Sequence, residues 1–312
     1  LRTAAGSPLT HAVVAGLMKS PEVHSVIAVH QAGEPESEHQ VPGVHSVSAD
    51  LTRRRDVQNL LQGIVSAANV DTILHMSLHS DARDRGQRVF RLNVESTRHL
   101  LSVAEEVPHI KRFVLRSFHD VYRVEHDSPL LFDENQPLEL SARTPQAARN
   151  HAEADLMVCA RMAVSRLQIA VLRCADVLAA GVSSQLYDYL SSKVCLRPLG
   201  YDPMVNVVSL SDAERALRLA ALSDATGTFN IPGKDSLPLS ELIHRARRID
   251  LALPGPILTP LYLLRARATG FRFHYETDRL RFHHGCILDG SAARERLHYT
   301  PLVSVSFEPG LH

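Results

Sequence analysis

Strand-length and helix-length segments alternate along the first half of the chain, and this alternation constrains the fold most. Apolar runs of strand length, often with β-branched residues, occur at 23–30, 71–77, 112–117 and 167–174. Apolar residues recur with helical spacing at 9–20, 55–68 and 93–107. Strands that alternate with helices in this way form βαβ units, whose strands are parallel. We therefore predict an α/β fold with a doubly wound parallel sheet.

The second half of the chain has a looser pattern. After Leu178, proline and glycine separate short elements, as in "LRPLGYDP", "FNIPGKDSLP" and "LALPGP". Such interruptions are typical of a small lobe that folds against a larger sheet. We predict a dinucleotide-binding-type domain over 1–178 and a smaller substrate-type lobe over 179–312.

Composition excludes several functions. The 312 residues carry a formal net charge of +0, so no basic surface for nucleic acid is expected. The four cysteines form no CxxC pair and the eighteen histidines are scattered, so we expect free thiols, a cytoplasmic protein and no metal site.

Membrane spanning is not expected either. The most apolar stretch, 251–264, is short and contains three prolines, which favours an apolar lid or lobe segment over a segment near a membrane. The chain begins without methionine and with little room for a first strand before Thr3, so we expect that N-terminal residues precede it.

The order of several motifs along the chain resembles one enzyme family. These motifs are "ADLT" (49–52), "DTILHMS" (71–77), "LNVESTRHLL" (92–101), "KRFVLRSFHDVYR" (111–123), "VLRCADVLAAG" (171–181) and "ILDGSAARERLHYTP" (287–301). The whole chain resembles a degenerate member of the extended short-chain dehydrogenase/reductase family, the NAD-dependent epimerase/dehydratase group. The resemblance implies a Rossmann-like fold, a structural role for Asn93, and an NAD(P) site. The residues implied for that site are Gly6, Asp50, Leu51, Met76, Ser77 and Arg149.

The cofactor loop departs from the family pattern. The family sequence Thr-Gly-x-x-Gly-x-x-Gly gives a tight turn and a bare backbone that approaches the pyrophosphate. Here Thr3 replaces the first glycine, Gly6 is kept, and Leu9 replaces the third. His30 stands where the family has an acid for the ribose hydroxyls. These changes predict weak NAD(P) binding or none.

The catalytic positions depart further. The family uses a tyrosine with a lysine four residues later on one helix face, and a serine or threonine near the substrate oxygen. A glutamate commonly follows the lysine by four, so counting back from Glu153 gives Arg149 and then Pro145. Counting back four from Tyr122 gives Phe118, with Ser117 next to it. The segment 130–167 contains neither tyrosine nor lysine, so no small shift restores the pair.

Three hypotheses follow. The first is a catalytically inactive member, a pseudoenzyme with a binding, scaffolding or regulatory role; the resemblance implies pairing of two copies through helices that begin near Asn93 and Thr144. The second is an active NAD(P)-dependent oxidoreductase or epimerase for a sugar nucleotide or hydroxysteroid-like substrate, with His119, Asp120 and Tyr122 as acid–base groups. The third is an NAD(P) sensor without turnover. We favour the first, and we expect "FHDVYR" to be an ordinary strand end and loop.

Overall fold

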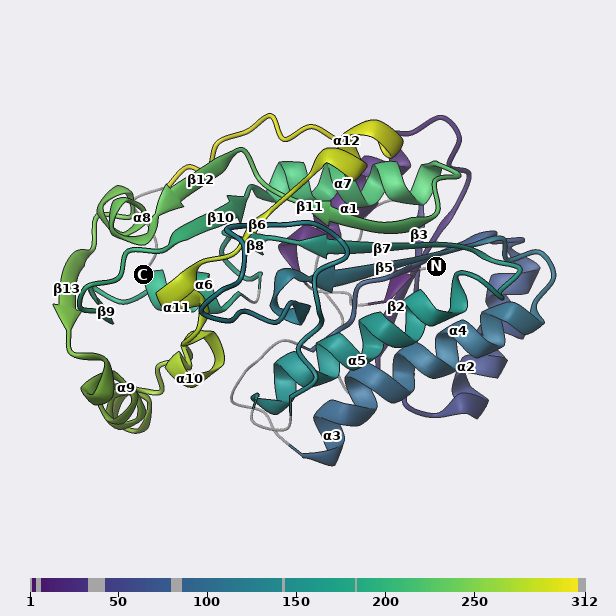
Figure 1. Cartoon of the computed structure of the whole chain (residues 1–312). Coiled ribbons are helices and arrows are strands. Elements are labelled where there is room, and N and C mark those ends of the chain that lie inside the picture. Colours follow the sequence, from purple (N-terminus) through teal and green to yellow (C-terminus); the bar gives the residue numbers. More distant parts are fainter. Residues whose placement is uncertain are drawn as a thin grey trace.

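A seven-stranded parallel sheet forms the centre of the computed structural model, which describes residues 2–3, 7–32, 43–79, 86–141, 144–182 and 184–307. The strand order is β11-β7-β5-β4-β1-β2-β3. The strands are β1 (Arg2–Thr3), β2 (Val26–Gln31), β3 (Val44–Ala49), β4 (Thr72–His75), β5 (Arg112–Phe118), β7 (Gln168–Cys174) and β11 (Gly227–Ile231). The predicted doubly wound, Rossmann-like sheet is confirmed (Figure 1).

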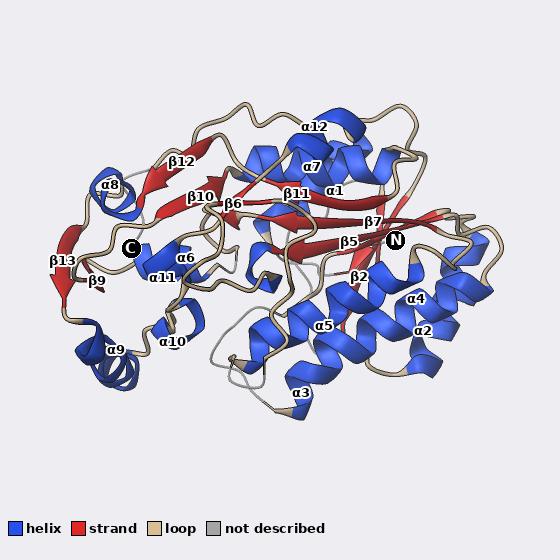
Figure 2. Cartoon of the chain, viewed as in Figure 1, coloured by secondary structure: helices blue, strands red, loops and turns tan. Residues whose placement is uncertain are grey.

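Helices cover both faces of this sheet, as Figure 2 shows. One face carries α1 (Pro8–Met18), α7 (Leu210–Leu222) and α12 (Ser291–Arg296), and the other α2 (Arg54–Leu60), α4 (Ser96–Glu106) and α5 (Gln146–Arg161). Helix α2 continues through a π-helical turn at Leu61–Val65; α3 (Gln87–Phe90) and a π-helical turn at Arg91–Glu95 precede α4. The central strands are buried on both faces, which explains why their sequences are apolar without a strict alternation.

The smaller lobe holds the remaining elements. Three short sheets contain β8 (Asp176–Val177), β10 (Met204–Val208) and β12 (Asp235–Pro238); β9 (Val194–Pro198) and β13 (Ile249–Leu253); and β6 (Leu131–Phe132) and β14 (Ile287–Leu288). The lobe helices are α6 (Gln185–Leu190), α8 (Leu239–Arg245), α9 (Gly255–Thr269), α10 (Tyr275–Asp278) and α11 (Arg281–His284). An aromatic cluster around Tyr189, Phe273 and Phe282 forms the core of the lobe.

The chain returns to the main sheet after Leu178. Strand β11 pairs in parallel with β7, and α7 packs against α1. The predicted boundary between 178 and 179 therefore does not coincide with the border between the sheet domain and the lobe, because α7 and β11 follow residue 179 but belong to the sheet domain. The lobe is built from three excursions of the chain: β6 before α5, the segment between β7 and α7, and the segment after β11.

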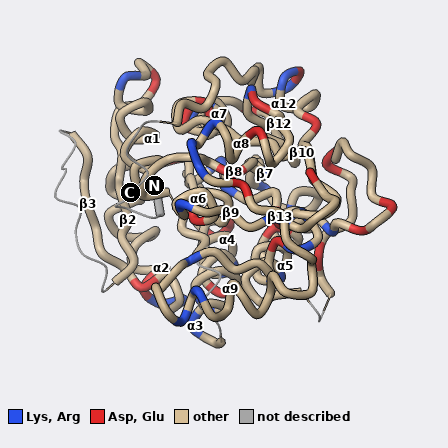
Figure 3. Tube along the Cα trace, turned by 90° about the vertical axis from the view of Figure 1, so that its left-hand side faces the viewer, with Lys and Arg blue, Asp and Glu red and all other residues tan. Residues whose placement is uncertain are grey.

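Two properties of the surface bear on possible partners. Within the described residues, no helix is both long and apolar enough to cross a membrane. Figure 3 shows Lys and Arg interspersed with Asp and Glu over one side of the molecule, as expected from the formal net charge of +0.

Candidate functional site

The helix that should carry the catalytic pair begins one residue later than predicted. Pro145 is the residue before the first turn of α5, with extended backbone angles, and Gln146 is the first helical residue. We predicted Pro145 inside the first turn and Thr144 as its cap. Proline is favoured at the first helical position, where its missing N–H leaves nothing unpaired, and its fixed φ also suits the residue before the helix, so the sequence alone does not separate the two places.

The acid that faces the sheet is Asp155, whereas Glu153 is exposed. The Asp155 carboxylate accepts hydrogen bonds from Ser117 Oγ at 2.6 Å and from Arg173 Nη2 at 2.7 Å. Residues four apart lie on one face of a helix, so the buried positions one and two turns before Asp155 are His151 and Ala147. Counting back from Glu153 gives Arg149 and Pro145, whereas counting back from Asp155 gives His151 and Ala147. Neither count supplies a tyrosine or a lysine.

Both ring nitrogens of His151 are engaged. Nδ1 lies 2.8 Å from Asp120 Oδ2, and Nε2 lies 2.9 Å from the carbonyl oxygen of His79. Each nitrogen faces an acceptor, so the geometry fits an imidazolium that donates twice. Burial lowers the pKa of His151, but the Asp120 carboxylate outweighs burial and the pKa is raised. His151 and Asp120 therefore form a buried ion pair.

Phe118 fills the space beside this ion pair. Its ring stacks on His151 with centroids 4.5 Å apart, and the guanidinium of Arg116 lies 4.5 Å from the centre of the same ring. We call the space at the carboxyl ends of β5 and β7 the crevice; Phe118, His119, Asp120, Asp176 and Asp278 line it. Between the residues that the structure describes, the crevice encloses only about 40 Å³.

The lobe supplies Asp278 to the crevice and Arg281 beside it, and sequence reasoning missed both residues. Arg281 donates to Asp278 Oδ1 at 3.2 Å and to the carbonyl oxygen of Tyr122 at 3.2 Å. On the other wall, His119 Nε2 lies 3.5 Å from Asp176 Oδ2. Asp278 is about 160 residues from His119 in sequence, so no local pattern joins them. In the sequence, only the charged residues of "TDRLRF" (277–282) could have indicated that this segment contributes to the crevice.

Two polar atoms at the crevice lack a partner among the residues that the structure describes. Asp278 and Arg116 are each only 8% exposed, yet Asp278 Oδ2 and Arg116 Nε make no hydrogen bond with any of these residues. Burial raises the pKa of Asp278 to about 7, although Arg281 opposes this shift. Burial lowers the pKa of His119, although Asp176 opposes the shift. Unpaired buried groups with perturbed pKa values are typical of functional sites.

Tyr122 lies outside the crevice. It is fully buried, its hydroxyl donates to Asn230 Oδ1 at 2.6 Å, and it accepts from Arg173 at 3.1 Å. Burial raises its pKa far above the usual value. Of the three alternative acid–base residues, only His119 and Asp120 therefore border the crevice. The expected strand end is confirmed, since β5 ends at Phe118 and a short 3₁₀ turn follows at His119–Val121.

Most of the described residues implied for the cofactor are buried or make hydrogen bonds to residues near them. Asp50 accepts from Gln31 Nε2 at 2.8 Å and from the Thr52 amide at 3.0 Å, immediately before α2. Leu51 and Met76 are buried, and Ser77 Oγ lies 3.2 Å from His75 Nδ1. Gly6 lies outside the described residues, as does the side chain of Thr3. Asp50 and Ser77 therefore have local hydrogen-bond partners, and the roles in cofactor binding that the resemblance implies for them stay predictions.

Two side chains near the predicted cofactor edge of the sheet have nitrogens without hydrogen-bond partners among the described residues. His30, the penultimate residue of β2, is 4% exposed, and neither of its ring nitrogens has such a partner. Arg149 is half-buried, and its Nε also has no partner in the described part of the chain. Leu9, at the place of the third glycine, is packed into the core with Val13. Asn93 holds the loop after β4, since its amide binds both the N–H and the carbonyl of His79.

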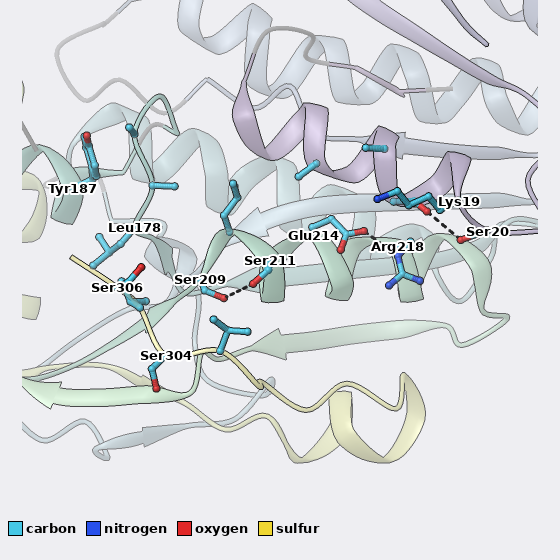
Figure 4. Close-up of a pocket in the computed structure, with 18 residues that line it drawn as sticks. Lys19, Ser20, Leu178, Tyr187, Ser209, Ser211, Glu214, Arg218, Ser304 and Ser306 are labelled. Atoms are coloured by element: carbon cyan, nitrogen blue, oxygen red, sulfur yellow. Dashed lines mark hydrogen bonds and ion pairs between the residues drawn. The ribbon is translucent and has the colours of Figure 1, made fainter. Parts of the chain in front are cut away.

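A cavity much larger than the crevice lies elsewhere in the described structure. It is a groove of about 1030 Å³ between α1, α7 and residues 303–306. Figure 4 shows Lys19, Glu214 and Arg218 at one end and Tyr187 at the other. None of the residues predicted for the site lines this groove. No group of three or more His, Cys, Asp or Glu among the described residues is arranged to hold a metal ion.

Sequence comparison identifies relatives of the chain. The model of the NAD dependent epimerase/dehydratase family matches residues 9–197. An uncharacterized protein of Mycobacterium tuberculosis is 29% identical over 259 residues, which cover 80% of this chain and 66% of that protein. An uncharacterized protein of Mycobacterium bovis gives the same values. The chain thus spans slightly less than two thirds of these relatives.

Structural comparison gives the same fold. UDP-glucose 4-epimerase from Thermotoga maritima, solved with UDP-glucose, superposes with a TM-score of 0.71 at 16% identity, covering 99% of this chain and 95% of that one. A dTDP-glucose 4,6-dehydratase from Bacillus anthracis, solved with NAD, gives 0.70 at 16% identity, covering 99% and 93%.

Proposed function

Because the chain belongs to the NAD-dependent epimerase/dehydratase family, we propose that it is a member that has kept the fold and lost hydride-transfer chemistry. It would then act by binding or regulation. The observation that carries this proposal is the filled crevice. About 40 Å³ remains between its described residues, whereas pockets for small molecules usually measure roughly 300–1,000 Å³.

The groups that face the nicotinamide end do not fit the family's chemistry. Ala147 and His151 take the tyrosine and lysine places when the count starts from the buried Asp155. Alanine has no proton to transfer. His151 has no free ring nitrogen, because Asp120 and the His79 carbonyl occupy both. Ser117 Oγ donates to Asp155 inside the fold, so it does not supply the missing crevice hydroxyl.

The adenosine end is different, and it supports weak NAD(P) binding. His30 is buried at the place where the family binds the ribose hydroxyls, and no described residue pairs with either of its ring nitrogens. An imidazole can exchange one hydrogen bond with a hydroxyl, but it does not hold a diol as a carboxylate does. We therefore expect an affinity for NAD(P) far below that of the family's enzymes.

A second candidate function is supported by His119. Its Nε2 lies 3.5 Å from Asp176, it retains some exposure to the crevice, and its pKa is lowered, which keeps it neutral near pH 7. A neutral histidine beside a carboxylate can act as a general base. In this alternative the chain is an active enzyme of the family with an unusual base.

The experiment that distinguishes these two functions measures both cofactor binding and product formation. The protein is titrated with NADH while cofactor fluorescence and the thermal midpoint are followed. It is then incubated with NAD⁺ and UDP-glucose or dTDP-glucose, the sugar nucleotides named for the structural relatives, and products are resolved by chromatography. We expect weak binding and no product. Product that is lost in His119→Ala but retained in the surface control Val164→Ala would establish the active alternative.

A further inference from the structure

Helix α9 (Gly255–Thr269) has apolar residues on its outer side as well as on its inner side. Leu258 and Tyr262 point inward and are buried in the lobe. The outer side carries four exposed aliphatic residues, Ile257, Leu261, Leu263 and Leu264, which are 46%, 37%, 38% and 63% exposed. No charged residue occurs between 255 and 264. A surface helix normally has a polar outer face.

The exposed residues form a continuous stripe. Ile257, Leu261 and Leu264 are spaced by four and three residues, so they lie on one face of the helix. Pro256 and Pro260 are also exposed and lie beside this stripe. Figure 1 shows α9 at the outer end of the lobe, away from the seven-stranded sheet. The stripe therefore lies on a helix at the outer edge of the lobe.

Cationic groups follow the stripe directly. Arg267, Arg272 and Arg279 are exposed, and none of them forms an ion pair among the described residues. Segment 255–285 contains only two acids. Asp278 is buried beside Arg281, and Glu276 accepts a hydrogen bond from Thr259. Segment 255–285 therefore has three exposed arginines, unpaired among the described residues, against one exposed acid, although the whole chain has a formal net charge of +0.

We propose that α9 is a docking helix for a membrane surface that contains anionic lipids. Aliphatic side chains on one face with arginines beside them match a helix that lies in the interfacial plane, because the stripe enters the acyl boundary while the cations bind headgroup phosphates. A second copy of the chain fits less well, because it would bring two cationic surfaces together. This inference is independent of the proposed loss of catalysis.

The test is sedimentation of the full chain with vesicles. One vesicle contains equal amounts of phosphatidylglycerol and phosphatidylcholine, and the other contains phosphatidylcholine alone. The variant carries Leu261→Glu and Leu264→Glu, both at exposed positions. The matched control carries Val164→Glu and Leu222→Glu, which add the same charge at exposed positions outside α9. Far-UV circular dichroism and thermal midpoints verify that all three proteins fold.

We expect the wild type and the control to bind the anionic vesicles and to release as salt rises. Binding of the α9 variant should fall about tenfold or more, because two apolar anchors become anionic. Equal binding of the α9 variant would overturn the proposal. A wild type that binds neither vesicle would also overturn it. If the wild type instead forms a dimer that the α9 variant dissociates, without vesicle binding, the stripe is an interface between copies.

Discussion

Replacing Asp278 by asparagine tests the electrostatics of the crevice quantitatively. Burial raises the pKa of this carboxyl from 3.8 to about 7. The folded protein therefore holds a proton on Asp278 between about pH 4 and 7, where the unfolded chain has released it. The stability associated with this proton is fully present at low pH and is lost as pH rises to about 7. A difference of about three pKa units corresponds to roughly 4 kcal/mol.

Asparagine resembles the protonated acid and can still accept from Arg281. Asp278→Asn should therefore match the wild type near pH 4 and exceed its unfolding free energy by roughly 3–4 kcal/mol at pH 8. Urea denaturation followed by far-UV circular dichroism at half-unit pH intervals measures this difference. Other titrating groups occur in both proteins and largely cancel. A difference that stays constant from pH 4 to 8 would refute the assignment of a perturbed, buried carboxyl.

Three further substitutions test the framework around the crevice. Asp155→Asn leaves the guanidinium of Arg173 buried without its carboxylate, so urea denaturation should show a loss of about 3–5 kcal/mol; an unchanged midpoint contradicts the ion pair. Asn93→Ala removes the side-chain amide that pairs with the backbone N–H and carbonyl of His79. This should lower stability by about 1–3 kcal/mol and speed hydrogen exchange at the backbone N–H of His79. Tyr122→Phe removes a hydroxyl that pairs with Arg173, and should cost about 1–3 kcal/mol without changing the pH dependence of stability.

Burial explains which parts of the fold could be predicted from the sequence. The strands at 112–118 and 168–174 are buried on both faces, so their sequences are apolar and easily recognised. Strand β11 was missed as a member of the main sheet, because GTFNI runs directly into the proline- and glycine-containing segment PGKDSLP and its pairing with β7 is non-local. A boundary drawn from composition therefore assigned it to the lobe.

The candidate site was predicted only in part, for a related reason. The sequence showed that the tyrosine and lysine are missing, because no shift of the count supplies them. It did not show which residues replace them. Glu153 and Asp155 are both acids on the same helix, and only burial against Arg173 identifies Asp155 as the one that faces the sheet. The crevice groups Asp278 and Arg281 depend on how the lobe folds over the sheet, which no local pattern encodes.

The most direct test of the central claim, the loss of hydride transfer, is a turnover experiment with the protein in molar excess over substrate. The full chain is mixed with NAD⁺ and a smaller amount of UDP-glucose or dTDP-glucose, and proton nuclear magnetic resonance follows the sugar for epimerised or dehydrated product over a day. The filled crevice and the engaged His151 predict an unchanged spectrum. Any product signal above that of a matched sample without the protein would contradict the account.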